Sequence, residues 1–484
     1  MMEYLYPTYG IDLTPDTVEQ CCATATRLLD EVGFVAAHEP FLQHLKGKAG
    51  LRIDGDRVYF EPALTHEYLE RFISSKAQEQ EKADRAAPSD EWQISIAGFS
   101  MSVLDIETEE VRPATCQDLR DLIKLANSFG IGGSYPCMPQ DLPPLMRAIA
   151  CFKICFEIAD NIRPYDYQQP EQTRYIYEMH QVIGRRFDVT LTVPSAMCVD
   201  PKDLSIFLDF YPDWKKHRDI NFRILDYVMI GIMKPVTAVG CATMTLAESL
   251  AIHMLLNLFD PEIHAPVIMG AGIPTDLRNA CWAFGSPRLH LFRYLASQVE
   301  WGLSGCGPQV YSIPHVLLET SSAAVDEQAA MEKMACGLMG AMQGARNFGY
   351  AGVLCVDDLY SGVQMVIDVE MVNYIRETIE AFDPHPDIIN MEGLYEECRE
   401  VALGDDTFIS HPNTVKRFRN IVPSPERIVR EKLNSWLSHC TTLKDRAREE
   451  ALERIRSFEP YQLPDHKQRE LDKIYAQAEA ELGQ

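Results

Sequence analysis

The chain has 484 residues, and its 71 acidic residues outnumber its 45 Lys and Arg residues, which gives a formal net charge of −26. Hydrophobic residues make up 46% and charged residues 24%, values typical of a soluble globular protein, so disorder and collagen-like sequence are excluded. The acidic surplus argues against nucleic-acid binding, because a phosphate backbone is bound through an excess of Lys and Arg.

The N-terminal sequence and the cysteine pattern indicate the compartment. The first twenty residues lack the basic and apolar regions of a signal peptide. The most apolar stretch, 243–259, is interrupted by Glu248 and His253 and falls short of a membrane span. We therefore expect a cytoplasmic protein with reduced thiols and no membrane partner. The sequence has no CxxC, HxH or HExxH, so no local metal motif is present, and ligands gathered from distant segments stay open.

The first part of the chain is predicted to be mainly helical and to end in a β-hairpin. Apolar spacing, capping residues and alternation place these elements. In chain order they are a helix at 13–32, a strand at 57–60, a helix at 62–73, a polar loop at 79–91 and a hairpin at 93–111.

Between about residues 115 and 393, short apolar runs alternate with helix-like segments. The runs are 131–138, 163–167, 189–195, 224–230, 266–271, 299–305, 348–354 and 365–369. The helix-like segments are 116–128, 142–159, 170–183, 203–211, 243–259, 287–296 and 329–343. Because a parallel strand needs a crossover connection, this alternation predicts a parallel sheet. About eight units match the size of a TIM (β/α)8 barrel, and a doubly wound open sheet is the competing interpretation.

The predicted organisation has three parts. Residues 1–114 form the N-terminal helical region with its hairpin, 115–400 form the α/β barrel domain, and 401–484 form a helical C-terminal extension. Within the extension, 426–458 is charged and helical by composition, and a final helix ends near Gly483. Nucleotide-binding motifs of the GxGxxG and GxxxxGK[ST] types are absent, which disfavours nucleotide-binding interpretations.

Seven short strings follow one another in register along nearly the whole chain. They are EVG at 31–33, DIET at 105–108 with RPAT at 112–115, PQDLP at 139–143, KPVT at 234–237 with AE at 247–248, AFGSP at 283–287, DEQAAMEK at 326–333 and HPNT at 411–414. Together they resemble the trimethylamine methyltransferase superfamily, in its branch without pyrrolysine. Two sites depart from the family pattern: Arg288 replaces an acidic residue, and Val356-Asp357-Asp358 stands where the family has Ser-Gly. The second departure predicts a different pocket.

The resemblance implies a TIM barrel that presents a methylated amine to the cobalt(I) of a separate corrinoid protein, in one-carbon metabolism or methanogenesis. Members without pyrrolysine are similar to glycine betaine, proline betaine, carnitine and γ-butyrobetaine methyltransferases. The cobalamin-type cofactor then belongs to the partner, so no tightly bound cofactor, no metal ligand and no catalytic nucleophile are expected in this chain. A quaternary ammonium needs neither proton nor metal to leave, because it departs as a neutral tertiary amine. The enzyme's task is to desolvate and align the substrate.

A pocket for such a cation combines aromatic faces with one or two carboxylates. In a barrel these side chains belong at the C-terminal ends of the strands and in the loops that follow. The predicted substrate-binding residues are Phe99, which could cover the mouth, Tyr135, Gln140, Tyr165, Tyr167, Phe284, Tyr311, Tyr350, Asp357 and Tyr360. Each has a simpler interpretation: a tyrosine near a strand end commonly packs with its hydroxyl hydrogen-bonded, and Asp357 could cap a helix or lie in a solvated turn.

Several functional alternatives stay open from the sequence. One keeps the fold but changes the methyl donor, one is a catalytically silent protein that senses a quaternary amine, and one is a metal-dependent barrel hydrolase. Arg278 and Arg288 are both possible partners for a substrate carboxylate. A homo-oligomer is possible, because the long terminal helices must pack on something.

Overall fold

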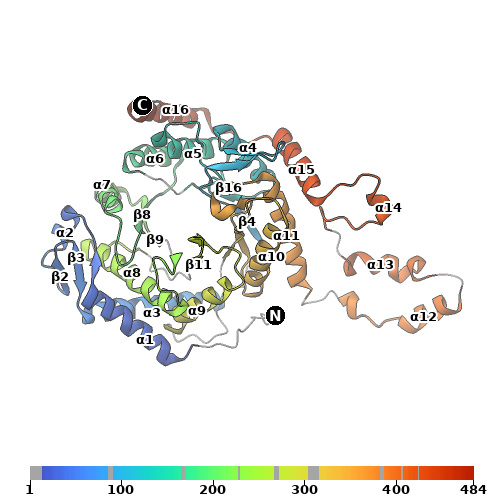
Figure 1. The fold of residues 1–484 in the computed structure, drawn as a ribbon, viewed down its shortest axis with the longest axis horizontal. Coiled ribbons are helices and arrows are strands. Elements are labelled where there is room, and N and C mark those ends of the chain that lie inside the picture. Colours follow the sequence, from blue (N-terminus) through green and yellow to red (C-terminus); the bar gives the residue numbers. More distant parts are fainter. Residues whose placement is uncertain are drawn as a thin grey trace.

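The computed structural model describes residues 13–85, 91–164, 169–226, 229–265, 272–303, 315–381, 386–404, 407–422 and 425–483. Of the predicted site residues, Tyr165, Tyr167 and Tyr311 lie outside these ranges. Figure 1 shows helices α4 to α11 arranged as a ring, with the N-terminal elements along one side and helices α12 to α14 extending away from the body.

The N-terminal part combines helices with a small antiparallel sheet of order β1-β3-β2. Its elements are α1 (Pro15–Arg27), a π-helical turn (Leu28–Val32), β1 (Phe34–Val35), α2 (Glu39–Leu45), β2 (Leu51–Asp54), β3 (Arg57–Phe60) and α3 (Pro62–Arg85). Thr14 caps α1 by accepting a hydrogen bond from the backbone of Thr17. The predicted loop at 79–91 is wrong for its first half, because its Glu, Lys, Arg and Ala residues are strong helix formers and continue α3 to Arg85.

The predicted hairpin divides between two sheets. Strands β5 (Ser102–Leu104) and β6 (Val111–Pro113) pair antiparallel, which confirms the turn between them. Strand β4 (Gln93–Ile96) instead pairs parallel with β7 (Gly132–Gly133) on one side and β14 (Asn347–Gly349) on the other. The parallel sheet therefore begins before residue 114, where the predicted boundary of the barrel domain lies.

Strands and helices alternate through the following region. They are α4 (Cys116–Ser128), β7, α5 (Pro144–Ile158), α6 (Pro170–Ile183), β8 (Phe187–Val193), α7 (Pro201–His217), β9 (Ile220–Asp226), β10 (Met229–Ile230), α8 (Ala238–Phe259), β11 (Ile273–Asp276), β12 (Cys281–Trp282), α9 (Leu289–Leu303), β13 (His315–Leu317), α10 (Glu327–Met342), β14, β15 (Val353–Leu354), β16 (Leu359–Tyr360) and α11 (Gly362–Glu380). The helices predicted at 116–128 and 170–183 are confirmed with the same bounds.

Two of the predicted strands are wrong. The run at 299–305 lies in α9 as far as Leu303, and the run at 365–369 lies in the middle of α11. Val299, Met365 and Val366 are buried, so these helix segments are apolar on the side that faces the core. A short apolar run cannot be assigned to a strand or to a buried helix from periodicity alone.

The parallel pairings fall into separate sheets among the described residues. One has the order β13-β14-β4-β7 and is extended by a bridge between Gly133 and Ile162. Strands β8 and β9 form a second parallel pair over seven residues each, and β10 pairs parallel with β11 in a third sheet. A helix of the ring connects β4 to β7, β8 to β9, β10 to β11 and β13 to β14, whereas β14 and β4 pair from opposite ends of this region of the chain. Closure of these sheets into one barrel is a prediction that the described pairings leave untested.

Helix α8 is the most apolar element of the core. Among the described residues it is the one helix long and apolar enough to cross a membrane, and 78% of its most apolar window is buried inside the protein. Its buried Glu248 is paired with Lys234 and accepts a hydrogen bond from the backbone of Met197 at 2.6 Å. This burial and this internal ion pair are typical of a core helix.

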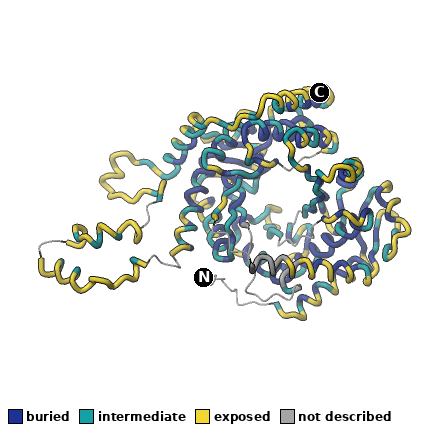
Figure 2. The backbone as a smooth tube through the Cα atoms, turned by 180° about the vertical axis from the view of Figure 1, so that it is seen from behind, coloured by how far each residue is buried: buried dark blue, intermediate teal, exposed yellow. Residues whose placement is uncertain are grey.

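The C-terminal part divides into helices that pack on the body and helices that do not. Helices α15 (Leu443–Ser457) and α16 (Asp465–Leu482) pack against α11 and α4, and against α5 and α6, respectively. Helices α12 (Leu394–Leu403), α13 (Pro412–Ile421) and α14 (Leu433–Trp436) stand away from the body, and Figure 2 shows that they are mostly exposed. The predicted helix at 426–458 is confirmed for α14 and α15 only, since 425–432 is not helical.

Candidate functional site

The loop that follows β14 has an unusual backbone. Tyr350, Cys355, Val356 and Asp357 all have positive φ, between 49° and 74°. Non-glycine residues rarely adopt this region, and a β-branched residue such as Val356 is strained there. Two hydrogen bonds hold the turn: the N–H of Cys355 donates to the Ser322 carbonyl at 2.7 Å, and the N–H of Val356 donates to the Thr320 carbonyl at 3.0 Å. These hydrogen bonds hold the strained turn in place and so fix the position of Asp357 within it.

Asp357 is held by the segment that follows β4. The N–H of Phe99 donates to both of its carboxylate oxygens, at 3.1 and 3.2 Å. The Ser100 hydroxyl lies 3.0 Å from the Asp357 carbonyl and 3.3 Å from its Oδ1. A Cβ at Gly98 would come within 2.8 Å of the same Oδ1, so only glycine leaves room there. The sequence predicts Asp357 as a site residue, and the structure places it against Phe99.

Burial changes the charge state of this carboxyl group. Desolvation raises the pKa of Asp357 to about 7, against the lowering effect of its hydrogen bonds from Phe99 and Ser100. The neighbouring charge of Asp358 raises it further, and no basic group contributes among the causes of this shift. Asp357 is therefore partly protonated near neutral pH and lacks a fixed countercharge among the described residues.

A second carboxyl group with a raised pKa follows β13. Glu319 is buried, and desolvation raises its pKa to about 8. The charge of Asp357 raises it further, while Arg293 and Lys333 lower it. Its Oε2 has no hydrogen-bond partner among the residues that the structure describes. Glu319 was not predicted as a site residue, because a single Glu after a short strand carries no motif.

Aromatic rings lie at the same ends of the strands. The rings of Phe99, after β4, and Tyr135, after β7, meet edge to face with their centroids 5.8 Å apart. Tyr350 directly follows β14, and its ring is half-buried. Three adjacent parallel strands thus bring three predicted aromatic residues and Asp357 to one end of the sheet, as expected for the C-terminal ends of parallel strands.

A buried ion pair supports the loop from α10 and α11. The Lys333 ammonium lies 2.7 Å from the Asp368 carboxylate, and both side chains are fully buried. Asp368 also accepts hydrogen bonds from the Gly352 N–H at 2.7 Å and the Gln364 amide at 2.8 Å. Tyr360 is fully buried, and its hydroxyl donates to the Ala351 carbonyl at 2.6 Å. These contacts fix both ends of the loop.

Two other predicted residues lie in their own local contacts. Phe284 is buried and packs edge to face against Trp282 at 5.2 Å. Gln140 donates from its side-chain amide to the Met138 carbonyl and from its backbone to the Ala114 carbonyl. Their roles in binding remain predictions, as do those of the other aromatic residues.

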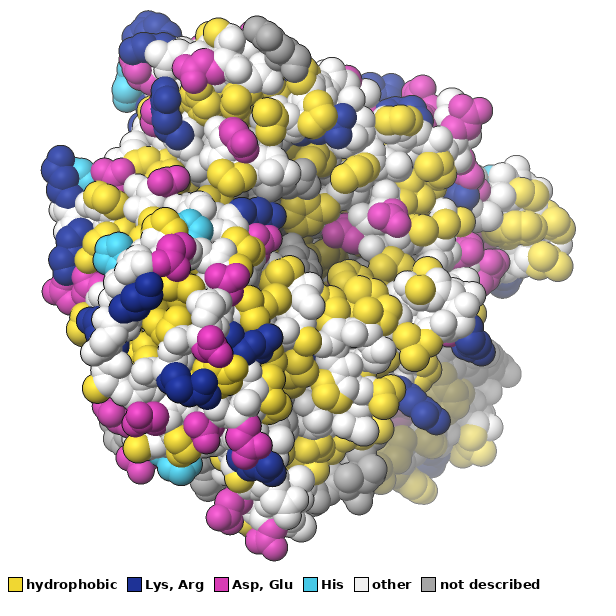
Figure 3. Space-filling view, turned by 60° about the vertical axis from the view of Figure 1, so that its left-hand side comes forward, with side chains coloured by type: hydrophobic (Ala, Val, Ile, Leu, Met, Phe, Trp, Pro, Cys, Tyr) yellow, Lys and Arg dark blue, Asp and Glu magenta, His cyan; other side chains and the backbone are white. Residues whose placement is uncertain are grey.

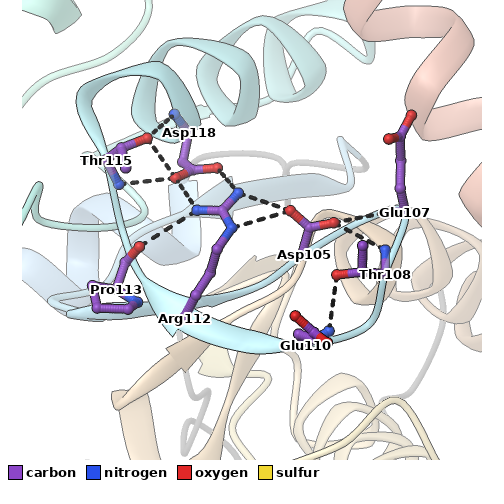
Figure 4. A network of polar contacts seen from close by, with 8 residues as sticks. All are labelled: Asp105, Glu107, Thr108, Glu110, Arg112, Pro113, Thr115 and Asp118. Atoms are coloured by element: carbon purple, nitrogen blue, oxygen red, sulfur yellow. Dashed lines mark hydrogen bonds and ion pairs between the residues drawn. The ribbon is translucent and has the colours of Figure 1, made fainter.

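The hairpin beside the site is fixed by an arginine. Arg112 on β6 forms bidentate ion pairs with Asp105 and Asp118, and its Nη1 lies 2.6 Å from Asp118 (Figure 4). Asp118 also closes the capping box of α4 by accepting from Thr115. Since β5 of this hairpin pairs parallel with β16, the network ties the loop that carries Asp357 to the start of α4.

A second buried ion cluster follows β9. Lys234 lies 2.9 Å from Asp226 and also pairs with Glu248 from α8, and all three side chains are almost fully buried. Burial lowers the pKa of Lys234 and raises that of Asp226. Lys234 and Glu248 lie in the strings KPVT and AE, which carry the family resemblance, and neither was predicted as a site residue. With two carboxylates to one ammonium, the cluster is a further candidate for contact with a cation.

The described residues contain no group of three or more His, Cys, Asp or Glu that could hold a metal ion. Two surface cavities, of about 470 and 690 Å³, open near the beginnings of β8 and β9 and of β4, at the opposite ends of the strands from Asp357. Figure 3 shows charged side chains of both signs scattered over one face, with apolar side chains gathered around a central hollow.

The chain is an α/β protein in which parallel strands alternate with helices. Its carboxyl and aromatic side chains lie at the C-terminal ends of the strands, where α/β enzymes have their active sites. The family model for trimethylamine methyltransferase (MTTB) matches residues 5–483, and the chain belongs to this family. The chain is a methyltransferase.

Individual relatives are distant. The chain is 21% identical over 397 residues to the trimethylamine methyltransferase MttB of Desulfitobacterium hafniense (strain DSM 10664 / DCB-2), which covers 80% of this chain and 77% of that protein. It is 27% identical over 220 residues to MttB2 of Methanosarcina mazei and 26% identical over 220 residues to MttB of Methanosarcina thermophila. Those two alignments cover 44% and 45% of this chain, and 41% and 42% of the relatives.

Proposed function

We propose that this methyltransferase takes its methyl group from a quaternary amine of the betaine or carnitine type and transfers it to the cobalt(I) of a cognate corrinoid protein. The observation that carries the proposal is the pair of carboxyl groups with raised pKa values, the half-buried Asp357 and the buried Glu319, beside aromatic rings at the C-terminal ends of parallel strands. The same arrangement supports the proposal that the separate parallel sheets are sectors of one eight-stranded barrel.

A cationic ligand would complete the charge balance of this site. Asp357 is half-buried, and the shift of its pKa has no basic contributor. A cation beside it would favour the ionised carboxylate, and the ring faces of Phe99 or Tyr135 would add cation–π attraction of about 2 kcal/mol when water is excluded. A neutral or anionic ligand would leave the carboxyl group protonated and gain nothing from its burial.

The raised pKa values favour a quaternary over a protonated tertiary amine. A trimethylammonium ion carries a proton that a carboxylate with a raised pKa can accept, so the pair can neutralise itself and lose its attraction. A quaternary ammonium has no proton to give, and its charge remains whatever the pH. Asp357 therefore discriminates best in favour of a permanent cation.

The transfer itself needs no acid or base from this chain. The methyl C–N bond breaks with its electron pair staying on nitrogen, which leaves a neutral tertiary amine. The electron pair of cobalt(I) forms the new Co–C bond, so the metal of the partner becomes methylcobalt(III). The role of the chain is to hold the methyl group in line and dry, and proximity of this kind is worth about 7–11 kcal/mol.

Calorimetry tests the charge argument. Glycine betaine, proline betaine, carnitine and trimethylamine would be titrated into the protein at pH 7 in buffers that differ in ionisation enthalpy. Binding of a quaternary amine is expected to release protons from Asp357 and Glu319, and Asp357→Asn is expected to reduce that release. Quaternary amines that bind with no proton release, or that fail to bind while trimethylamine binds, would contradict the proposal.

A further inference from the structure

One segment of the chain has no place in the site or the core. The arm, defined here as the described residues between Pro386 and Cys440, leaves the body after α11 and returns at α15. Figures 1 and 2 show it extending from the ring of helices, with exposed residues along most of its length. Helices α12, α13 and α14 contain no buried residue.

The exposed apolar side chains of the molecule are concentrated on the arm. Of the 25 large hydrophobic side chains that are exposed in the described residues, 16 lie between Ile388 and Leu437. Ile409 is 80% exposed and Tyr395 is 74% exposed. Single apolar residues on a surface need no explanation, but a continuous group of this size marks an interface.

The helices of the arm carry apolar side chains that are exposed in the single chain. On α13, Val415, Phe418 and Ile421 recur at intervals of three residues, which places them along one face. The polar residues, in contrast, are partnered within the arm: the Asn413 amide donates to Glu397 at 2.8 Å, and the Asn420 amide donates to Asp387 at 3.0 Å. The arm thus has an ordered polar side and an uncovered apolar side.

We infer that the arm packs against the arm of a second copy of this chain. Its two longer helices carry opposite charges: α12 has three Glu and one Arg, whereas α13 has one Lys, two Arg and no acidic residue. Within one copy they meet at His411, the N-cap of α13, which lies near Glu397 and Glu400 of α12. Glu396, Lys416 and Arg419 form no ion pair among the described residues and are left for a partner. A two-fold axis would place α12 of one copy against α13 of the other. The contact between an acidic and a basic helix would then occur twice in the dimer. A self-complementary surface of this kind is what a symmetric dimer requires.

The arm leaves the body away from the site and returns beside it, so the test must distinguish a second copy from the corrinoid protein. Asp357 comes shortly before the start of α11 at Gly362, whereas the arm begins beyond the other end of that helix, which is about 28 Å long. The arm returns at α15, where Lys444 and Arg448 pair with Glu109 of the hairpin beside the site. The acidic residues of α12 disfavour nucleic acids and anionic membranes, which would be repelled.

Sedimentation velocity of the full chain tests the inference. The wild-type protein is expected to sediment as a dimer or a larger even-numbered assembly. The double variant Ile409→Asp, Phe418→Asp is expected to sediment as a monomer with an unchanged circular-dichroism spectrum, since both side chains are exposed in the single chain. Met331→Asp is the matched control, because Met331 is 66% exposed on the outer side of α10, and this variant is expected to keep the wild-type mass.

A charge exchange identifies the pairing. Chains with Glu396→Lys and Glu400→Lys, and separately chains with Lys416→Glu and Arg419→Glu, are expected to self-associate at least tenfold more weakly than wild type. Mixing the two variants, one carrying an affinity tag, is expected to give a mixed dimer. A monomeric wild type, or arm variants that keep their mass, would overturn the inference. Arm variants that lose methyl transfer to a corrinoid protein but not to free cobalamin, with their mass unchanged, would overturn it in favour of that partner.

Discussion

The loop from Tyr350 to Tyr360 and the arm are both irregular insertions, yet they have opposite relations to the rest of the chain. The loop is bound by contacts with segments far away in sequence, from Phe99 to Asp368, and its backbone is strained to fit them. The arm is held by contacts within its own length and by the buried Arg427, which pairs with Glu370 of α11 and Glu450 of α15, and its apolar side chains are exposed. The loop is complete within one chain, whereas the arm requires a partner.

This contrast indicates how each region acts. Strain and buried charge in the loop persist only because the surrounding structure fixes them, which is typical of a site that must present one geometry. The stabilisation gained by burying the exposed apolar residues of the arm depends on protein concentration, because these residues are buried only when two chains associate. Changes in the loop should therefore affect folding and catalysis at any concentration.

The largest expected effect is at the support of the loop. Lys333→Met would leave Asp368 as a buried charge without its ammonium partner, so it is expected to lower the free energy of unfolding by about 3–5 kcal/mol. Denaturant unfolding measures this loss. The double variant Lys333→Met, Asp368→Asn serves as the control and should recover part of it. A loss below 1 kcal/mol in the single variant would show that the loop does not depend on this pair.

The next effect is on turnover. Asp357→Asn keeps the shape of the side chain but removes its charge, and it is expected to lower kcat/KM for a quaternary amine by about 10²–10³-fold. Asp358→Asn is the matched control, because Asp358 is the exposed neighbour of Asp357. We expect Asp358→Asn to change kcat/KM by less than about threefold, since an exposed charge is screened by water. Equal effects of the two substitutions would remove Asp357 from the site.

A pH dependence should accompany this charge. Because binding of a permanent cation requires the ionised form of Asp357, and its pKa is raised to about 7, affinity should fall as the pH drops below 7. The affinity should fall by at most about tenfold per pH unit, because binding displaces one proton from Asp357. The unbound protein shows the opposite sign: a raised carboxyl pKa favours folding at low pH, and that contribution is lost as the pH rises through about 7. Asp357→Asn should flatten both profiles, and an unchanged affinity profile would contradict the assignment.

The smallest expected effect concerns the strained backbone of the loop at Val356, in comparison with the backbone of an ordinary helix. Val356→Gly removes the strain of a β-branched residue at a φ of 58°, so it is expected to leave stability unchanged or raise it by about 1 kcal/mol. Ala476→Gly, at an exposed position of α16, is the control and should lower stability by about 1 kcal/mol, since glycine weakens an ordinary helix. Thermal unfolding of both variants distinguishes the outcomes. A large loss at position 356 would show that its side chain, rather than its backbone, matters.

Local signals in the sequence predicted much of the fold. Capping residues and amphipathic periodicity predicted α4 and α6 with their observed bounds, and alternation predicted the antiparallel pairing of β5 with β6. They failed where burial removes periodicity: the middle of α11 is apolar on several sides and resembles a strand. They also failed for β4, because the partners of a strand are chosen by tertiary packing and not by its own residues.

The candidate site was predictable only in part. Position near a strand end was enough to select Tyr135 and Asp357, and Phe99 was predicted in the hairpin as a cover of the mouth; the structure brings all three to one end of the sheet. Glu319 could not be selected, because its raised pKa comes from burial, a property that a single residue in a sequence does not display. The positive φ of Val356 was equally hidden, since nothing in the residue itself favours that conformation.

The most direct test of the account is methyl transfer to cobalt. The protein would be mixed with reduced free cobalamin and a panel of glycine betaine, proline betaine, carnitine, γ-butyrobetaine and trimethylamine, while the visible spectrum is recorded. We predict conversion of the cobalt(I) spectrum to that of methylcobalt(III) with at least one quaternary amine, at a rate reduced in Asp357→Asn. Conversion with trimethylamine alone, or tight binding of every amine with no spectral change, would contradict the account.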